Sequence, residues 1–455
     1  MNHSLFSEFP KITKDAWLAQ VTKDLKGKNF DDTLTWHTTE NFDIQPYYTQ
    51  EDLEALPIEQ IQAVQRNKKS GVMQNRITIG FVEEKETNSL IINSLQSGAD
   101  AVTVDFDDRL ISEISLVRLL NNIKLSETPV YFKTHQKNEL LENLLKFVGY
   151  QPKGGFQSDF LADSFFSPNH DISISTWENT KYLIEKTAKF PHFQAFSIES
   201  HVYHSAGANA VQELAFTMAS AVEYLDQLTS LGLAPEQIIT RFTFSISIGT
   251  NYFIEIAKLR ALRYLWSKVL DAYNVSSLIQ NCFVHGQTSS FYEAKLSPYA
   301  NMIRATTEAM SGIMGGCDAL TVLPYDGSKN VDFAQRIAQN VTILMQEEAH
   351  LDKTLDPSAG SYYVENLTYK LASEAWILFQ KIEKMGGIVA TFEQGFMQEI
   401  INESYEAKMK SLQNGKVMVG VNKFRVEPEN ELLLGETITK NSIFLQNRRV
   451  SEIFE

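Results

Sequence analysis

Short apolar segments that alternate with helical patterns run from residue 77 to residue 323, and they constrain the fold more than any other feature of the chain. Each has the length and the β-branched or aromatic content of a buried strand. Apolar residues between them recur at helical spacing, most clearly in Val211–Leu228 and Phe253–Leu270. The eight expected strands are Ile77–Phe81, Ala101–Phe106, Pro129–Phe132, Gly155–Phe160, Gln194–Ile198, Thr243–Ile248, Cys282–Thr288 and Ala319–Leu323. Strand-then-helix order favours a closed (β/α)8 TIM barrel over an open sheet.

The stretch Arg304–Gly327 holds one complete unit of this alternation. Its first half has apolar residues at helical spacing, and Gly315-Gly316 is expected to stop that helix. Ala319–Leu323 then has the character of a short buried strand. After a loop that contains proline and glycine, a second long helix is expected to begin near Val331.

The segment Phe242–Gly249 alternates large apolar residues with small ones. Because successive strand residues face opposite sides, one face of this strand would present small hydroxyls. Thr103 and Ser197 could extend that polar lining, although barrel interiors are more often filled by Val, Ile and Leu. The alternative is a helix-covered strand whose serines and threonines meet neighbouring polar groups.

The composition argues against several classes of function. The chain has 455 residues and a net charge of −15, which disfavours a nucleic-acid partner because phosphates attract basic surfaces. No apolar run is long enough for a membrane span, and no signal peptide is recognised at the N-terminus. Cys282 and Cys317 lack CxxC spacing and are expected to be buried thiols in a reducing cytoplasm. The nine histidines include no HExxH pair, so no metal site is predicted.

The chain is expected to divide into four parts. These are an N-terminal arm at residues 1–70, a barrel core at 71–330, helices that complete and flank the barrel at 331–424, and a tail at 425–455. The tail has no clear period. The flanking part is expected to be helical in three long segments, Val331–Ala349, Leu367–Met385 and Phe392–Leu412.

The arm combines one amphipathic helix with an aromatic stretch. Thr13 is expected to cap the helix and Gly27 to end it, and its apolar stripe consists of Trp17, Leu18, Val21 and Leu25. The aromatic stretch that follows contains Trp36, Phe42, Tyr47 and Tyr48. Neither part can bury its own apolar surface, so the arm must pack on the chain's own barrel or on another subunit.

Several motifs resemble the cobalamin-dependent methylmalonyl-CoA mutase family. The similarity is closest in Arg304–Gly327 and continues through Gln346-Glu347-Glu348, Asp356-Pro357, Gly360–Glu365 and Gly420–Phe424. The arm is similar to that of the small, non-catalytic subunits of this family. The resemblance implies a barrel whose axis is lined with small polar residues and threaded by an acyl-CoA.

The catalytic positions of the family are altered here. The resemblance places His201 where the family has a tyrosine beside the radical pathway, and Val202 where it has a histidine that polarises the thioester carbonyl. Val202 has no hydrogen-bond donor, so this role is lost. Within Gly315–Leu323, Asp318, Thr321 and Leu323 replace the polar Gln, His and Asn of the catalytic subunits. No catalytic residue is therefore predicted in this chain.

Other family positions are retained. His285, Gln287 and Ser289 match a substrate-contacting motif at a strand end, although Phe283 replaces the arginine two residues earlier. Gln346 matches as well. These four residues are predicted as a vestigial substrate-binding set. Arg304 and Glu308 are expected to form an ordinary ion pair on a helix face.

The resemblance assigns the cofactor to a partner. The family binds adenosylcobalamin through an Asp-x-His-x-x-Gly motif, and the one partial match, His204–Gly207, has Val202 at the aspartate position. Because only the 31 residues 425–455 follow Phe424, we expect no cobalamin domain in this chain. The large subunit of a heterodimer would hold the cofactor and interconvert methylmalonyl-CoA and succinyl-CoA.

Three alternatives remain open at this point. The chain could isomerise another acyl-CoA with a cobalamin domain supplied in trans, or bind CoA without catalysis. It could also belong to the lyase or aldolase barrels, for which Lys133 at a strand end is the candidate Schiff-base lysine. Lys133 is more simply explained as a surface or loop lysine.

Overall fold

A closed parallel barrel forms the centre of the computed structural model, which describes residues 12–68, 73–167, 172–328, 332–425 and 444–455. Its strand segments are β3 (Gln74–Gly80), β4 (Ala101–Asp105), β5 (Val130–Lys133), β6 (Gly154–Phe156), β7 (Phe193–Gln194), β8 (Phe196–Glu199), β9 (Phe242–Ile248), β10 (Val284–Thr288) and β11 (Ala319–Thr321). Only Ala195 separates β7, which pairs with β6, from β8, which pairs with β9. The segments therefore make eight strands, and pairing of β11 with β3 closes the ring. The predicted TIM barrel is confirmed.

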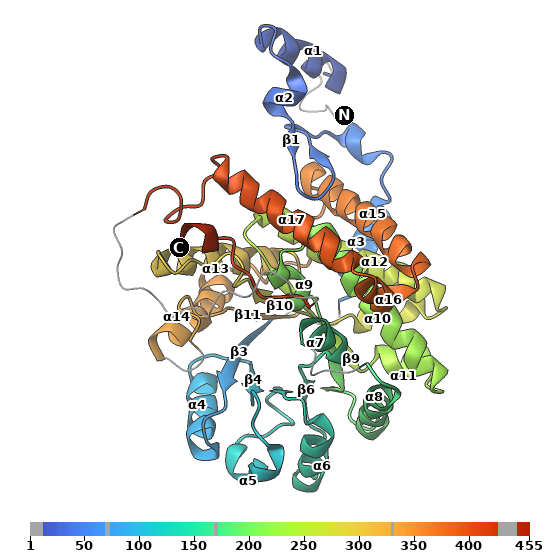
Figure 1. The fold of residues 1–455 in the computed structure, drawn as a ribbon, viewed down its shortest axis with the longest axis vertical. Coiled ribbons are helices and arrows are strands. Elements are labelled where there is room, and N and C mark those ends of the chain that lie inside the picture. Colours follow the sequence, from blue (N-terminus) through green and yellow to red (C-terminus); the bar gives the residue numbers. More distant parts are fainter. Residues whose placement is uncertain (1–11, 69–72, 168–171, 329–331, 426–443) are drawn as a thin grey trace, which may run out of the picture.

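Helices surround the barrel in the expected order (Figure 1). They are α4 (Glu84–Gln96), α5 (Leu116–Leu119), α6 (Lys137–Phe147), α7 (Phe160–Phe166), α8 (Ile174–Thr187), α9 (His201–Ala206), α10 (Ala210–Ser230), α11 (Pro235–Ile239), α12 (Tyr252–Ala272), α13 (Pro298–Met314) and α14 (Asp332–Ile343), with 3-10 turns at Ile111–Glu113 and Ser276–Asn281. The helices expected at Val211–Leu228 and Phe253–Leu270 are α10 and α12. Phe242 and Phe244 of β9 pack edge-on against Trp266 of α12, so the apolar face of this strand points outward.

Strand β6 is shorter than the expected Gly155–Phe160 and depends on two glycines. Gly154 has a φ of +109°, and a Cβ there would lie 2.0 Å from the carbonyl oxygen of Val130. A Cβ at Gly155 would lie 2.3 Å from the carbonyl oxygen of Gln194. The neighbouring strands approach so closely that only glycine fits, and glycine carries little strand signal of its own.

The arm extends from the barrel (Figure 1) and comprises α1 (Lys14–Asp24), α2 (Phe30–Leu34), the antiparallel ribbon β1 (Trp36–His37) and β2 (Asp43–Ile44), a 3-10 turn (Gln50–Leu53) and α3 (Ile58–Arg66). Thr13 caps α1 as predicted, accepting a hydrogen bond from the Ala16 N–H. Neither α1 nor α2 contains a buried residue. The inner part packs on the body, where Tyr48 contacts Tyr363 and Lys370 donates to the carbonyl of Asp43.

The C-terminal helices are α15 (Tyr362–Lys384), α16 (Gly387–Glu393) and α17 (Phe396–Gln413), preceded by a π-helical turn at Leu344–Glu348. The helix expected at Val331–Ala349 is α14 with this turn, although Val331 itself lies outside the described residues. The helix expected at Phe392–Leu412 is divided, because Gly395 adopts a left-handed φ of +78° between α16 and α17. Helix α15 packs against α10 and α12.

The last described segment, residues 444–455, folds back over the carboxyl ends of the barrel strands. Backbone N–H groups of Leu445, Arg448 and Val450 donate to carbonyls of Phe165, Ser205 and Phe291, at 2.8, 2.8 and 2.9 Å. These acceptors follow β6, β8 and β10, respectively. We call this end of the barrel the mouth, and the chain's own tail covers part of it.

Candidate functional site

The hydroxyl-bearing face of β9 points into the barrel, as one sequence hypothesis held. The Ser245 hydroxyl lies 2.8 Å from His201 Nε2 and 2.8 Å from His285 Nδ1. His285 Nε2 lies 2.8 Å from the Thr321 hydroxyl, and His201 Nδ1 lies 2.7 Å from that of Ser247. A continuous chain of hydrogen bonds thus joins β9, β10, β11 and α9 across the barrel interior.

Arg76 of β3 occupies the other side of the interior. Its Nε donates to the Thr103 hydroxyl at 2.8 Å, and its Nη2 donates to Gln157 Oε1 at 2.6 Å. The guanidinium carbon lies 3.5 Å from the centroid of the Tyr131 ring. Burial lowers the pKa of Arg76 to about 10. We use the name lumen network for these side chains, which are Arg76, Thr103, Tyr131, Gln157, His201, Ser245, Ser247, His285 and Thr321.

Both histidines of the lumen network are held neutral. Burial lowers the pKa of His201 to about 4 and that of His285 well below its ordinary value of 6.5. A neutral imidazole has one donor and one acceptor nitrogen, and the hydroxyls around each ring can meet both. The two histidines therefore satisfy their polar groups without ionisation.

The remaining sequence-predicted site residues lie apart from one another. Val202 packs against the main apolar core, and Leu323 contributes its backbone N–H, which donates to Thr288. Gln287 is half-buried on β10, in register with Ser247 and Thr321. Ser289 lies at the mouth. Gln346 donates to the carbonyl of Met73, directly before β3, and so lies at the opposite end of the barrel.

A cavity of about 750 Å³ opens at the mouth beside β8, β9 and β10. Its walls come from segments far apart in the sequence: the arm at Trp36–Glu40, the start of α12, the loop at residues 416–419, and Val450 of the tail. Its size is typical of small-molecule sites.

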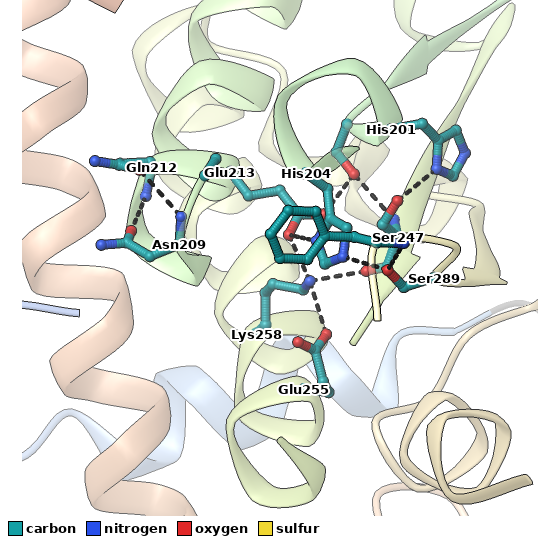
Figure 2. Close-up of polar contacts among 12 residues, drawn as sticks. His201, His204, Asn209, Gln212, Glu213, Ser247, Glu255, Lys258 and Ser289 are labelled. Carbon is teal, nitrogen blue, oxygen red and sulfur yellow. Dashed lines mark hydrogen bonds and ion pairs between the residues drawn. The ribbon is translucent and has the colours of Figure 1, made fainter. Parts of the chain in front are cut away.

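A cluster of buried charges lies beside this cavity, and His204, Glu213 and Glu255 help to line it. Figure 2 shows the polar contacts within the cluster. Lys258 of α12 lies between two carboxylates, 2.6 Å from Glu213 Oε2 and 2.7 Å from Glu255 Oε2. His204 of α9 places Nδ1 3.2 Å from Glu213 Oε2 and Nε2 2.7 Å from the Ser289 hydroxyl. We call these five residues the mouth cluster.

The mouth cluster contains buried ion pairs, which the lumen network lacks. Burial alone would raise the pKa of Glu213, but Lys258 and His204 outweigh it and lower the value to about 2. Lys408, on α17 above the cluster, has its pKa lowered to about 8 by burial. Burial also raises the pKa of Glu40 on the arm side of the cavity.

The order Ser289, His204, Glu213 has the connectivity of a nucleophile, base and acid set. Two features weigh against that role. The Ser289 hydroxyl is buried, accepts a hydrogen bond from the Phe291 N–H at 3.1 Å and is not part of the cavity wall. The carboxylate oxygen that orients His204 is also ion-paired to Lys258. The arrangement is therefore better suited to holding the floor of the cavity in place.

Several smaller sequence predictions can be compared with the geometry. Arg304 donates to Asn301 and to the carbonyl of Val419, and no ion pair with Glu308 forms within 4 Å in the described chain. Lys133 is half-exposed and lies 3.5 Å from Asp105, as expected of a surface lysine.

Both cysteines are free and buried. No grouping of three or more metal-ligating side chains occurs among the described residues, and none of the described helices is long and apolar enough to span a membrane.

Comparison with known proteins identifies relatives over nearly the whole chain. The family model described as Methylmalonyl-CoA mutase matches residues 148–453. The chain is 32% identical to the methylmalonyl-CoA mutase small subunit of Porphyromonas gingivalis, over 96% of this chain and 73% of that protein. It is 28% identical to the small subunit from Streptomyces virginiae, over 92% of this chain and 72% of the relative. Identity to the Cereibacter sphaeroides mutase is 31%, over 92% of this chain and 65% of that protein.

Proposed function

This chain belongs to the methylmalonyl-CoA mutase family, and we propose that it is the small, non-catalytic subunit of a heterodimeric mutase. The large subunit would hold adenosylcobalamin and interconvert methylmalonyl-CoA and succinyl-CoA. Two small subunits among the relatives support this choice. The free buried thiols are compatible with a cytoplasmic complex.

The observation that carries the proposal is the filled lumen. An acyl-CoA that threaded the barrel would have to displace Arg76 from Tyr131, Thr103 and Gln157. It would also break the bonds of Ser245 to two histidines. Opening such a network would leave several buried donors and acceptors unpaired, at a cost of about 1–3 kcal/mol for each.

The residues at the mouth do not fit a corrin. Active sites of such barrels lie at the carboxyl ends of the strands, but here the tail bonds to Phe165, Ser205 and Phe291 across that end. The arm at Trp36–Glu40 further encloses the space beside it. We therefore assign adenosylcobalamin to the partner and derive no reaction step through it in this chain.

We assign association with the partner mainly to the outer part of the arm, which contains α1 and α2. Trp17 contacts Phe30 and Tyr47, so an aromatic cluster lies on a part of the chain in which α1 and α2 bury nothing. Aromatic side chains give large contact area at interfaces. Gln65 of α3, at the inner end of the arm, donates to the carbonyl of Arg260, so α3 packs on the body. Removal of residues 1–34 therefore tests the arm without disturbing that contact.

The test is co-purification with a second chain that carries an intact Asp-x-His-x-x-Gly domain. The full-length protein should form a 1:1 complex, and the protein lacking residues 1–34 should remain folded by circular dichroism but lose most of the affinity. Full affinity of the truncated protein would show that the arm is not the interface. Failure of the full-length chain to bind any such partner would refute the subunit assignment itself.

Two alternative functions can be tested with the same purified proteins. If the chain isomerises another acyl-CoA with a cobalamin domain in trans, mixing it with that domain and a panel of acyl-CoAs should give turnover. If it is a CoA-binding barrel, calorimetry should detect CoA binding below millimolar concentration. Val202 and Leu323 argue against the first function, and the filled lumen argues against the second.

A further inference from the structure

The mouth cavity combines the volume of a ligand site with an exposed apolar rim. Four large apolar side chains that line it are substantially exposed, namely Trp36, Ile303, Val417 and Val419. Ile254, Leu412 and Val450 continue the apolar wall and are buried. Exposed apolar side chains that gather around a hollow indicate a surface that a ligand with an apolar body would cover. Every lining residue belongs to this chain, so the site does not depend on the proposed partner.

The Gly420–Phe424 motif holds one side of this rim in place. Its Asn422 donates to the carbonyl of Lys416 at 2.7 Å. Arg304 of α13 donates to the carbonyl of Val419 at 2.6 Å. These bonds fix the loop at residues 416–419 against α13, and both Arg304 and Lys416 line the cavity there.

Charged side chains of both signs line the cavity, but their charges are balanced in different ways. These side chains are Glu40, Glu213, Glu255, Arg304, Lys408 and Lys416. Glu213 and Glu255 share an ion-pair partner, Lys258, which lies between them. Among the described residues, none of the three lining cations lies within 4 Å of a carboxylate oxygen, and Lys408 donates to two carbonyls instead. The cations thus keep positive charge that no anion of the described chain pairs with directly.

The carboxyl groups nearest to Arg304 do little to balance its charge at pH 7. Glu308 and Glu293 are the acids that act on it. Burial raises the pKa of Glu293 to about 8 and that of Glu308 well above its ordinary value of 4.5, so both favour the neutral form. Arg304 itself donates only to neutral oxygens, Asn301 Oδ1 and the carbonyl of Val419. A guanidinium has five N–H donors, so Arg304 can still donate to a ligand.

We propose that the mouth cavity binds a small organic carboxylate with an apolar body. The carboxylate would accept charge-assisted hydrogen bonds from Arg304 and Lys416 at the rim. The apolar body would cover Val417 and lie against Ile254 and Leu412. An ammonium ligand of the same shape would meet these two cations unfavourably.

Three probes of nearly equal shape test this proposal by calorimetry on the full chain at pH 7. Phenylacetate is anionic, 2-phenylethanol is neutral and 2-phenylethylamine is cationic. Phenylacetate should bind about tenfold more tightly than 2-phenylethanol, the value expected for one charge-assisted hydrogen bond, and the amine should bind most weakly. Equal or tighter binding of the alcohol or the amine would overturn the proposal, and so would an absence of phenylacetate binding at millimolar concentration.

Two variants and a control locate the site. Arg304→Gln should reduce phenylacetate affinity about tenfold and remove most of the preference over 2-phenylethanol. Lys416→Gln changes an exposed side chain that has no hydrogen bond within the described chain, so it should fold like the parent and reduce affinity about threefold. It decides the matter if Arg304→Gln does not fold.

The control is Lys410→Gln, which removes an exposed lysine of α17 that does not line the cavity and should bind phenylacetate like the parent protein. Unchanged phenylacetate affinity in Lys416→Gln, or in a folded Arg304→Gln, would show that the anion binds elsewhere and would overturn the assignment.

Discussion

The barrel lumen and the barrel mouth are both polar and largely buried, yet they satisfy their polar groups in different ways. In the lumen, Ser245 joins two neutral histidines and Arg76 is matched by Thr103, Gln157 and the Tyr131 ring. At the mouth, buried charges lie beside a cavity and are satisfied by ion pairs, with Lys258 between Glu213 and Glu255. A barrel lumen can thus be polar and still be filled by its own hydrogen-bonded side chains, while a cavity remains at the mouth beside it.

Truncating Arg76 should have the largest effect on the lumen. Arg76→Ala leaves a void and removes the donors to Thr103 and Gln157, so the free energy of unfolding should fall by about 4 kcal/mol. Urea denaturation measures the change. Arg66→Ala alters an exposed arginine and is the matched control. A loss of less than about 1 kcal/mol in Arg76→Ala would show that the lumen is not a tightly packed network.

The lumen histidines should make stability fall in acid. The pKa of His201 is about 4 when folded and near 6.5 when unfolded, so the unfolded state binds more protons between these values. Stability is present above pH 6.5 and is lost as the pH falls towards 4, by about 3 kcal/mol in all. His201→Gln keeps a donor and an acceptor but should lose this pH dependence. Parallel pH curves for variant and parent would contradict the neutral buried histidine.

A buried glutamate beside the mouth should change stability with pH in the opposite direction. Burial raises the pKa of Glu293 to about 8, against 4.5 when unfolded, although Arg449 opposes the shift. The folded state therefore holds the extra proton in this window, and stability is lost as pH rises from 4.5 to 8. Glu293→Gln should be more stable than the parent by about 2 kcal/mol at pH 7 and little changed at pH 4.5. Thermal melts of the variant and the parent at the two pH values measure this difference. An equal change in stability at pH 4.5 and pH 7 would contradict the raised pKa of Glu293.

Removing a single hydroxyl from the lumen should have a smaller effect. Ser245→Ala deprives His201 and His285 of their shared partner and should cost about 1–2 kcal/mol. Ser290 is exposed, so Ser290→Ala is the control and should be neutral. Equal stability of the two variants would mean that the histidines are satisfied in another way.

Restoring a histidine at position 202 should have the smallest effect of all. Val202 packs against the core rather than into the cavity, so Val202→His should not create a carbonyl-polarising group. Turnover by the proposed heterodimer should stay within experimental error of the parent. A clear gain in turnover would show that this barrel still meets the substrate.

The sequence predicted the barrel well because buried strands and amphipathic helices have local periods. Seven of the eight strands and the helices α10, α12 and α15 follow from that signal, whereas β6 consists of two glycines and Phe156 and carries little of it. The break at Gly395 was missed because glycine can also continue a helical pattern, and the left-handed φ there depends on how α16 and α17 pack.

The sites were harder to predict because their contacts join distant segments. Glu213 and Lys258 were visible as charges within apolar helices, but their pairing depends on the packing of α10 and α12. Arg76 directly precedes the predicted strand Ile77–Phe81, and a basic residue at the start of a buried strand could have indicated a filled lumen. The tail covers the mouth through backbone hydrogen bonds, which impose no periodicity on its sequence.

The most direct test of the central claim is to count acyl-CoA sites in the proposed heterodimer. Equilibrium dialysis with succinyl-CoA at saturating concentration gives the number bound per pair of chains. If the lumen of this chain is closed and only the large subunit takes substrate, the result should be one site per heterodimer. Two sites per heterodimer would contradict the account, because the second acyl-CoA would have to occupy the barrel that Arg76 and the lumen histidines fill.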